Sequence, residues 1–189
     1  RASSIVGDKT QVLDLWNLLK PFWNKPREIR SNQPVLVIND APLLSPDPLV
    51  RPAVLRDLEI LLPACVSMFT EEVGVSPVVG SSEQIYRARI SEVIQQRKMF
   101  ARIDQSQVTF KAEIGVATDQ VCQIQGVWVP PQLRGRDYGK AGMAAVVDLT
   151  RKYFSPMVSL YVNDYNERAR AVYKSVGFQE HSTFATVLF

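Results

Sequence analysis

The sequence predicts a mixed α/β fold in which helices flank a central sheet. Three observations support this prediction. The middle of the chain holds several strand-like segments separated by turn signals, the C-terminal part follows a βαβ order, and a proline-rich stretch sets off a short N-terminal portion. With 189 residues, the natural count is one full domain plus part of another.

The N-terminal portion is predicted to contain one helix and one short strand. Apolar residues recur at helical spacing over residues 9–20, at Val12, Leu15, Trp16 and Leu19. Pro21 ends this run, and residues 34–39 have the composition of a strand. The segment 9–23 carries too much apolar surface for an isolated arm, so we expect it to pack against the body of the protein.

A domain boundary is expected near residue 48. Four prolines fall between Asp40 and Pro52, and this density is typical of a linker. We therefore divide the chain into residues 1–48, the C-terminal part of an N-terminal domain plus a linker, and residues 49–189, the main domain. The first residue is Arg rather than Met, so we expect a fragment or a processed product.

The main domain is expected to begin with a short strand and two helices. The strand covers 50–54, and the first helix follows from Leu55 to about Phe69, with Pro63 either kinking it or starting a new helix. Ser81 and Gln84 have the spacing of a capping box and precede an amphipathic helix that continues to Ile94.

The rest of the domain is expected to alternate strands, turns and helices. Strands are predicted at 99–103, 107–115, 121–129, 157–162 and 182–189, and helices from near Gly139 to Tyr153 and from Glu167 to Val176. Gly177 suits the C-terminal cap of the last helix. The last strand could leave an open sheet edge, which would allow a homodimer.

Composition narrows the function. A net charge of +3 is too small to indicate a nucleic-acid or membrane partner. Cys65 and Cys122 lie in apolar runs and read as reduced core residues, which favours a cytoplasmic protein. The single histidine, His181, cannot provide a metal site, and no ligand spacing is present, so we expect no metal.

The segment from Trp128 to Ala141 has the pattern of a phosphate-binding turn. An apolar strand runs into two glycines, Gly135 and Gly139, and a helix follows. Glycines allow a ligand to approach the backbone, and the N–H groups of a helix start point at an anion. The turn residues expected to contribute are Arg134, Gly135, Arg136, Asp137, Tyr138, Gly139 and Lys140.

This turn and a second motif resemble the GNAT superfamily of N-acetyltransferases. The family carries Arg/Gln-x-x-Gly-x-Gly/Ala at the acetyl-CoA pyrophosphate and Asn-x-x-Ala-x-x-x-Tyr-x-x-x-Gly-Phe on its last helix. The second pattern matches here at Asn166, Ala169, Tyr173, Gly177 and Phe178. The resemblance covers about residues 49–189 and implies a GNAT-like mixed, mostly antiparallel central sheet flanked by helices, with a short N-terminal remnant of a second domain.

The first pattern can be placed in two registers. In the preferred one, Arg134 and Gly139 match and Asp137 stands where the family usually has its first glycine. The other register, with Arg136, Gly139 and Ala141, fits the bare pattern. Asp137 brings a negative charge toward a diphosphate, so only its backbone N–H could help binding.

The resemblance implies the roles of several further residues. The strand 125–129 would pair with the pantetheine arm, and a backbone N–H among Val127, Trp128 and Val129 would polarise the thioester carbonyl. Trp128 either packs in the core or lines that groove. Tyr173 would be the general acid that protonates the coenzyme A thiolate, or else a core tyrosine. Asn166 would cap the last helix and contact the coenzyme.

The general base is less determined. Glu71 and Glu72 lie on the helix bordering the acceptor side of this fold, and Glu113 lies on a strand; we choose Glu72, with water as an alternative. Cys122 is not expected to be a nucleophile, because no histidine is near it in sequence.

Segments such as Met68–Gly74 and Ser159–Asn166 are similar to an actinobacterial branch of these acetyltransferases that has an extra N-terminal domain of unknown function. The expected function is transfer of an acetyl group from acetyl-CoA to a primary amine by direct attack in a ternary complex. The acceptor, a small molecule or a peptide, stays open. The alternatives are transfer of a larger acyl group, and a non-catalytic module that binds coenzyme A or a partner, which Asp137 would favour.

Overall fold

The computed structural model describes residues 3–80 and 82–189, and over these residues eight strands form one sheet. The elements, in chain order, are β1 (Ser4–Asp8), α1 (Lys9–Leu19), β2 (Glu28–Ile38), β3 (Arg51–Pro52), η1 (Leu55–Asp57), α2 (Leu58–Val73), α3 (Ser82–Gln95), β4 (Met99–Asp104), β5 (Gln107–Ala117), β6 (Val121–Trp128), η2 (Pro131–Leu133), α4 (Tyr138–Tyr153), β7 (Met157–Tyr161), α5 (Glu167–Val176) and β8 (Gln179–Leu188). The prefix η marks short 3-10 helices.

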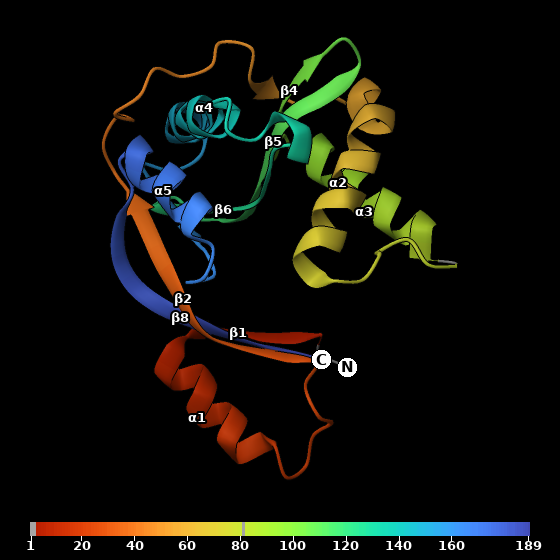
Figure 1. Ribbon diagram of the computed structural model, residues 1–189, viewed down its shortest axis with the longest axis vertical. Coiled ribbons are helices and arrows are strands. Elements are labelled where there is room, and N and C mark those ends of the chain that lie inside the picture. The colour runs from red at the N-terminus through yellow and green to blue at the C-terminus, as the bar shows by residue number, and fades with distance from the viewer. Residues whose placement is uncertain (1–2, 81) are drawn as a thin grey trace.

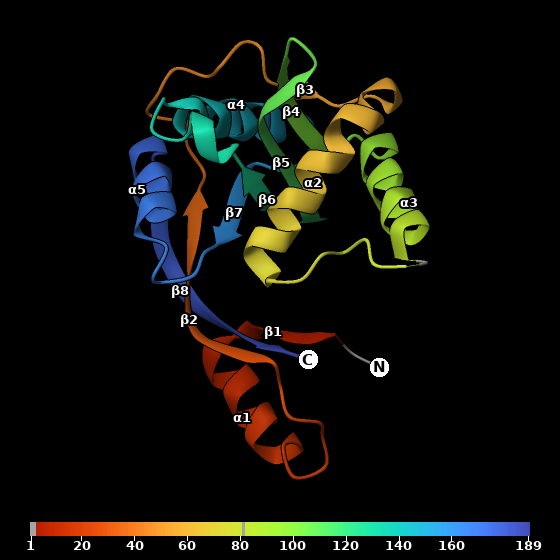
Figure 2. The same ribbon diagram turned by 45° about the vertical axis from the view of Figure 1, so that its right-hand side comes forward.

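The strand order is β1-β8-β2-β7-β6-β5-β4-β3, and the pairs are antiparallel except β6 with β7. Figures 1 and 2 show α2 and α3 on one side of the sheet and α4 and α5 on the other. Each side has its own core. On one side, Phe110 of β5 is clustered with Met143 and Val146 of α4. On the other side, Leu61 and Cys65 of α2 are clustered with Ile90 of α3. The mixed, mostly antiparallel sheet predicted from the sequence is therefore confirmed.

The main-domain elements lie close to their predicted positions. Pro63 sits inside α2, which continues through it, and Gly177 caps α5 with a left-handed φ of +114°. The predicted capping box includes Ser81, which lies outside the described residues. Cys65 and Cys122 are buried free thiols, and burial raises the pKa of Cys122 to about 12.

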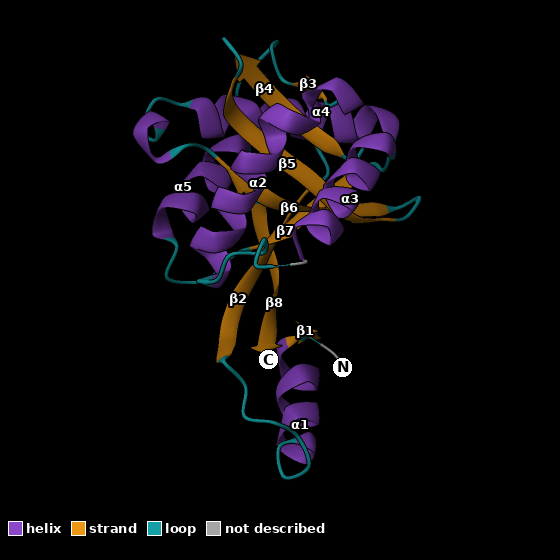
Figure 3. Cartoon of the chain, turned by 90° about the vertical axis from the view of Figure 1, so that its right-hand side faces the viewer, coloured by secondary structure: helices purple, strands orange, loops and turns teal. Residues whose placement is uncertain are grey.

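The N-terminal portion differs most from expectation. Residues 4–8 form β1, which the sequence analysis missed, and β2 begins at Glu28 rather than near residue 34. Strand β2 lies between β7 and β8 and is antiparallel to both. Figure 3 shows β2 and β8 running together from the body of the sheet down to β1 and α1.

Helix α1 packs against β8, as predicted. Val12 and Trp16 are buried against Ala185 and Val187, and the Trp16 ring meets the Phe189 ring edge-on at 5.6 Å. Other apolar side chains of this segment, such as Leu18 and Phe22, stay exposed.

The expectation of an open edge at the last strand is wrong. Strand β8 has partners on both sides, because β1 and β2 flank it, so the sheet ends at β1 and β3. The N-terminal segment therefore supplies the neighbours that the sequence analysis left out. No helix among the described residues is long and apolar enough to cross a membrane.

Candidate functional site

Strands β6 and β7 separate partway along their length. They pair in parallel only from Val121 with Met157 to Gln123 with Ser159, while β6 continues to Trp128. A bulge at Gly126, where φ is +58°, bends β6, and the Lys111 ammonium donates to the Gly126 carbonyl at 2.8 Å. The far half of β6 therefore has a backbone edge that β7 does not cover.

This uncovered part of β6 leads directly into the predicted phosphate turn. After Pro130 the chain makes the short helix η2 and then reaches α4. Gly135 and Asp137 both have left-handed φ angles, +81° and +61°, and Asp137 is the N-cap residue of α4 without a side-chain cap bond. The first N–H groups of α4 thus lack intrahelical acceptors, which is the arrangement that binds an anion.

The left-handed φ at Asp137 gives a physical reason why a glycine is usual here. L-residues other than Asn and Asp adopt this conformation at a cost, and Asp is among those that tolerate it. The Asp137 carboxylate forms an ion pair with the Lys140 ammonium at 2.9 Å. The negative charge that the sequence analysis identified is therefore partly offset by a neighbouring cation.

Arg134 is turned toward α2. Its Nη2 donates to the Glu71 carboxylate at 2.7 Å, and its Nε donates to the Val129 carbonyl at 3.0 Å. The hydrogen bond from Arg134 holds the pKa of Glu71 below its usual range. In this conformation Arg134 anchors the turn, while Arg136 and Lys140 remain as the nearby cations; contact of Arg134 with a phosphate stays a prediction.

Trp128 lies where β6 ends. Its ring is half-buried and packs against the core under α2 and α3, and its Nε1 donates to Glu71 at 3.2 Å. It also lines a groove of about 930 Å³ between α2, the β4–β5 hairpin and the Pro130–Pro131 segment. The predicted packing role is present at this residue, whereas lining of the pantetheine groove stays a prediction, because this groove lies on the α2 side of the sheet and no described residue of β7, α4 or α5 lines it.

Tyr173 lies on α5 and is almost fully buried. Its ring packs against Phe178 with centroids 5.9 Å apart. Burial raises the pKa of the Tyr173 hydroxyl well above its usual value, and the charge of Glu72 raises it further. The hydroxyl is therefore protonated at neutral pH and lies within the electrostatic range of Glu72. Asn166 caps α5 as predicted, since its side chain accepts from the Ala169 N–H at 3.1 Å.

The three candidate bases occupy different environments. Glu72 lies in the last turn of α2, and its half-exposed carboxylate is 3.9 Å from Arg30. Glu113 is buried; burial acts to raise its pKa, but Lys111, Arg89 and a hydrogen bond from Gln125 outweigh this and hold the pKa low. Glu71 is paired with Arg134. Of the three, Glu72 has the longest ion pair, and its charge acts on the Tyr173 hydroxyl.

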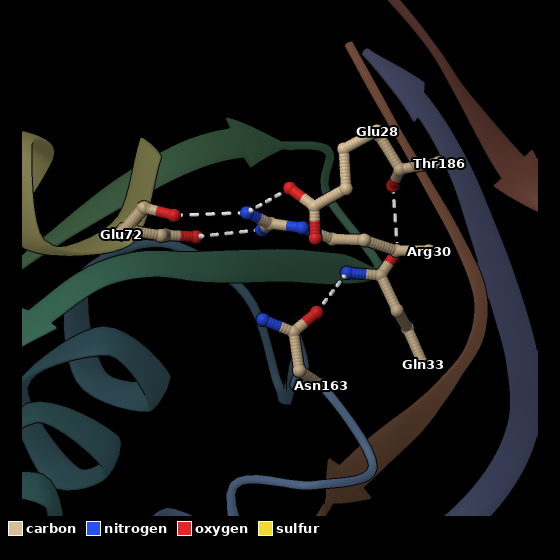
Figure 4. Close-up of polar contacts among 6 residues, drawn as sticks. All are labelled: Glu28, Arg30, Gln33, Glu72, Asn163 and Thr186. Carbon is tan, nitrogen blue, oxygen red and sulfur yellow. Dashed lines mark hydrogen bonds and ion pairs between the residues drawn. The ribbon is translucent and has the colours of Figure 1, made fainter. Parts of the chain in front are cut away.

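A polar cluster beside Glu72 was missed by the sequence analysis. Figure 4 shows that it joins β2, α2, β8 and the loop after β7. Arg30 donates to the Glu72 carbonyl at 2.8 Å and to the Glu28 carboxylate at 3.0 Å, and Gln33 donates to Asn163 at 2.8 Å. Partners 42 and 130 residues apart in sequence leave no local signal that could have revealed them.

The described residues contain no group of three or more histidine, cysteine, aspartate or glutamate side chains placed to hold a metal ion. His181 is exposed on β8.

The arrangement of the sheet, the separation of β6 from β7 and the helices on either side define the GNAT fold. Residues 100–178 match the model of the acetyltransferase (GNAT) family, and residues 1–61 match the model of a domain of unknown function, DUF4081. No curated protein matches the chain significantly.

Solved structures agree on the fold. An acetyltransferase from the GNAT family of Colwellia psychrerythraea superimposes with a TM-score of 0.63 at 14% identity, covering 98% of this chain and 64% of its own. A putative acetyltransferase from Novosphingobium aromaticivorans gives 0.61 at 16% identity, covering 87% and 66%. This chain thus spans about two thirds of those two proteins.

A predicted acetyltransferase with acetyl-CoA from Clostridium acetobutylicum gives a TM-score of 0.54 at 16% identity, covering 70% of this chain and 90% of its own. At these identities the likeness concerns the fold.

Proposed function

We propose that the chain is an acetyl-CoA-dependent N-acetyltransferase that transfers the acetyl group to a primary amine by direct attack in a ternary complex. The observation that carries the proposal is the path of β6, which leaves β7 after Gln123 and leads into the start of α4. The match of residues 100–178 to the acetyltransferase family and the acetyl-CoA named for the Clostridium acetobutylicum structure support it. A cytoplasmic location and the actinobacterial branch belong to the same proposal.

The donor would bind along β6 and across the start of α4. Uncovered N–H groups of Val127 to Val129 would pair with the pantetheine arm, and one of them would polarise the thioester carbonyl. The diphosphate would lie against the first N–H groups of α4 beside Arg136 and Lys140. Acetyl-CoA supplies the thioester whose carbonyl carbon is attacked.

Tyr173 would supply the proton to the leaving group. The amine nitrogen bonds to the carbonyl carbon, the C–S bond breaks, and the coenzyme A thiolate takes the hydroxyl proton. The raised pKa keeps this hydroxyl protonated before the reaction. The same shift makes it a weaker acid and makes the resulting tyrosinate a stronger base, so the tyrosinate would quickly regain a proton from water.

Glu72 would take the other proton, from the amine. Glu71 and Glu113 are poorer candidates because both have lowered pKa values and lie within 2.8 Å of an arginine, whereas Glu72 lies 3.9 Å from Arg30. The non-catalytic alternative drawn from Asp137 is not favoured, since Lys140 offsets that carboxylate.

Donor binding is tested by calorimetry with acetyl-CoA. We expect the native protein to bind and Arg134→Ala to weaken binding about 10-fold, because the turn loses its anchor to Glu71 and Val129. Arg136→Ala is the matched control: this exposed cation has no ion pair among the described residues, so about a 2- to 3-fold loss is expected. A native protein that does not bind acetyl-CoA would overturn the proposal.

The acid role is tested by Tyr173→Phe, followed by thiol release with acetyl-CoA and a panel of amines. We expect kcat to fall about 100-fold with unchanged donor affinity. Tyr161→Phe removes another shielded phenol, on β7, and should retain activity. Full activity in a folded Tyr173→Phe variant would remove the acid role.

A further inference from the structure

A small cavity of about 160 Å³ lies between the start of β2 and the loop after β7. Glu28, Arg30, Asn163 and Asp164 are among the residues that line it. Arg30 connects this cavity to the proposed transfer site, because its guanidinium also binds the carbonyl of Glu72 at the end of α2 (Figure 4). The cavity is therefore adjacent to the proposed base.

A buried relay fixes the orientation of the Asn163 amide. The Thr186 hydroxyl donates to Oε1 of Gln33, so Nε2 of Gln33 faces away and donates to Oδ1 of Asn163 at 2.8 Å. Gln33 and Thr186 are 2% and 6% exposed, so water does not compete for these bonds. An amide has one acceptor and one donor end, and its oxygen is now used. The Nδ2 group of Asn163 is left as a donor without an acceptor among the described residues (Figure 4).

Arg30 adds a second unused donor. Its side chain is only 10% exposed, and its Nη2 donates to the Glu28 carboxylate and to the Glu72 carbonyl. Its Nε is buried and has no acceptor in the part of the chain that the structure describes. This buried Nε is closed to solvent, whereas Nδ2 of Asn163 is not, so of the two unused donors the Asn163 amide is the one open to a ligand.

The charges around the cavity select the kind of oxygen. Glu28, Glu72 and Asp164 carry three negative charges, and Arg30 carries one positive charge. A second cation, Arg170, donates to the Asp164 carbonyl at 3.2 Å, but its charge is paired with Glu180. The Asp164 carboxylate receives only neutral donors, from Asn32 and from the Tyr165 N–H. A free carboxylate would be repelled, whereas an ammonium group would be attracted. The unused Asn163 donor therefore fits an uncharged oxygen that lies close to a cationic amine.

We propose that this cavity is the acceptor subsite and that it selects an amine with an adjacent uncharged carbonyl, as in an amino-acid amide or the α-amine of a peptide. The carbonyl oxygen accepts from Nδ2 of Asn163, and the ammonium faces the carboxylates. Gln33 is a positioning residue that acts through Asn163. The inference rests on the proposed function, and it gives strand β2, in the segment matched by the domain of unknown function, a role in substrate choice.

The test compares three acceptors of similar size: alaninamide, alanine and sec-butylamine. Thiol release gives kcat/KM for each with the native protein, Asn163→Ala, Gln33→Leu and the control Asn17→Ala, an exposed residue on α1. The three amines differ in intrinsic basicity, so the diagnostic quantity is the change in the alaninamide to sec-butylamine ratio caused by each substitution. Calorimetry of alaninamide in the presence of coenzyme A measures the same preference without turnover.

Loss of one neutral hydrogen bond should lower that ratio about 3- to 10-fold in Asn163→Ala and in Gln33→Leu, and leave it unchanged in Asn17→Ala. A merely structural role for Gln33 would lower both rates together and keep the ratio. Unchanged ratios in both variants, or alanine as the preferred acceptor, would overturn the inference while turnover upheld the proposed function. Selective alaninamide binding without any turnover would overturn the proposed function and keep the acceptor subsite. If neither selective binding nor turnover were observed, the proposed function and the subsite would both be overturned.

Discussion

The side chain of Asp137 gives the sharpest test of the phosphate turn. Asp137 has two unfavourable features: its left-handed φ of +61° strains the backbone, and its carboxylate at the start of α4 would repel a phosphate. Asp137→Gly removes both of them. Asp137→Asn removes only the charge, because asparagine tolerates the left-handed region as well as aspartate does. The pair of variants therefore separates backbone strain from electrostatics.

The expected magnitudes follow from the geometry. A carboxylate about 6 Å from a diphosphate charge is repelled by about 2.8 kcal/mol at an effective dielectric constant of about 20. The Asp137 side chain is 74% exposed and the Lys140 ammonium lies 2.9 Å away, so most of this is screened or offset. About 0.5–1 kcal/mol should remain, which corresponds to about 2- to 5-fold in affinity. The Asp137→Asn substitution would also free Lys140 to approach the phosphates.

Calorimetry with acetyl-CoA at low and at high ionic strength measures this effect. At low salt we expect Asp137→Asn to bind about 2- to 5-fold more tightly than the native protein, with the gain shrinking as salt screens the charges. Asp137→Gly should show the same gain. Its unfolding free energy should change by less than about 1 kcal/mol, because relief of strain is countered by the greater freedom of glycine in the unfolded chain. Identical affinities of the native protein and Asp137→Asn at low salt would refute the reasoning.

Two further predictions concern stability. Gly142→Ala should lower the unfolding free energy by about 1–2 kcal/mol in a chemical denaturation experiment, because its new Cβ would meet the Phe110 ring at 2.6 Å. Gly139→Ala on the same helix places its Cβ in ordinary contact at 3.8 Å and should be neutral or stabilising, so equal losses in both variants would contradict the packing argument. Asp57→Asn should cost about 1 kcal/mol at neutral pH, since Arg51 holds that carboxylate at 2.7 Å and lowers its pKa. Because the folded-state pKa is lowered, the contribution of Asp57 is present above its unfolded value of 3.8 and is lost as the pH falls through the folded value; the Tm difference between the two proteins should shrink there, and a difference that grows in acid would contradict this.

The sequence predicted the elements of the main domain because their signals are local. Helical periodicity, hairpin turns and the cap at Gly177 each depend on a few consecutive residues, and the structure places them within a few positions of the prediction. The beginning of β2 was missed for a physical reason. Residues 28–33 are mostly polar, so no apolar pattern marks them, and their strand conformation depends on pairing with β8, which lies about 150 residues further along the chain.

The candidate site also contains features that the sequence predicted and features that it could not predict. Asn166, Tyr173 and the turn around Gly135 and Gly139 lie in motifs that can be read from the sequence, whereas their environments cannot. The engagement of Arg134 by Glu71 joins residues 63 positions apart. The sequence analysis treated the cations of the turn as free, whereas in the structure one of them, Arg134, is held by other groups of the protein. The burial that raises the pKa of Tyr173 likewise depends on tertiary packing.

Through strand β2, the N-terminal segment contributes to the central sheet and to the proposed acceptor subsite. The expected division near residue 48 follows the proline-rich linker and stays a prediction, but β2 lies before it and is hydrogen-bonded on both sides by strands that lie after it. Without β2, β7 and β8 would each expose a row of unpaired backbone groups, and the Gln33 relay to Asn163 would be lost. The linker is also held to the main domain, because the Leu43 and Asp47 N–H groups bind the carbonyls of Val176 and Ala141. The segment before the linker is thus part both of the sheet and of the proposed acceptor subsite.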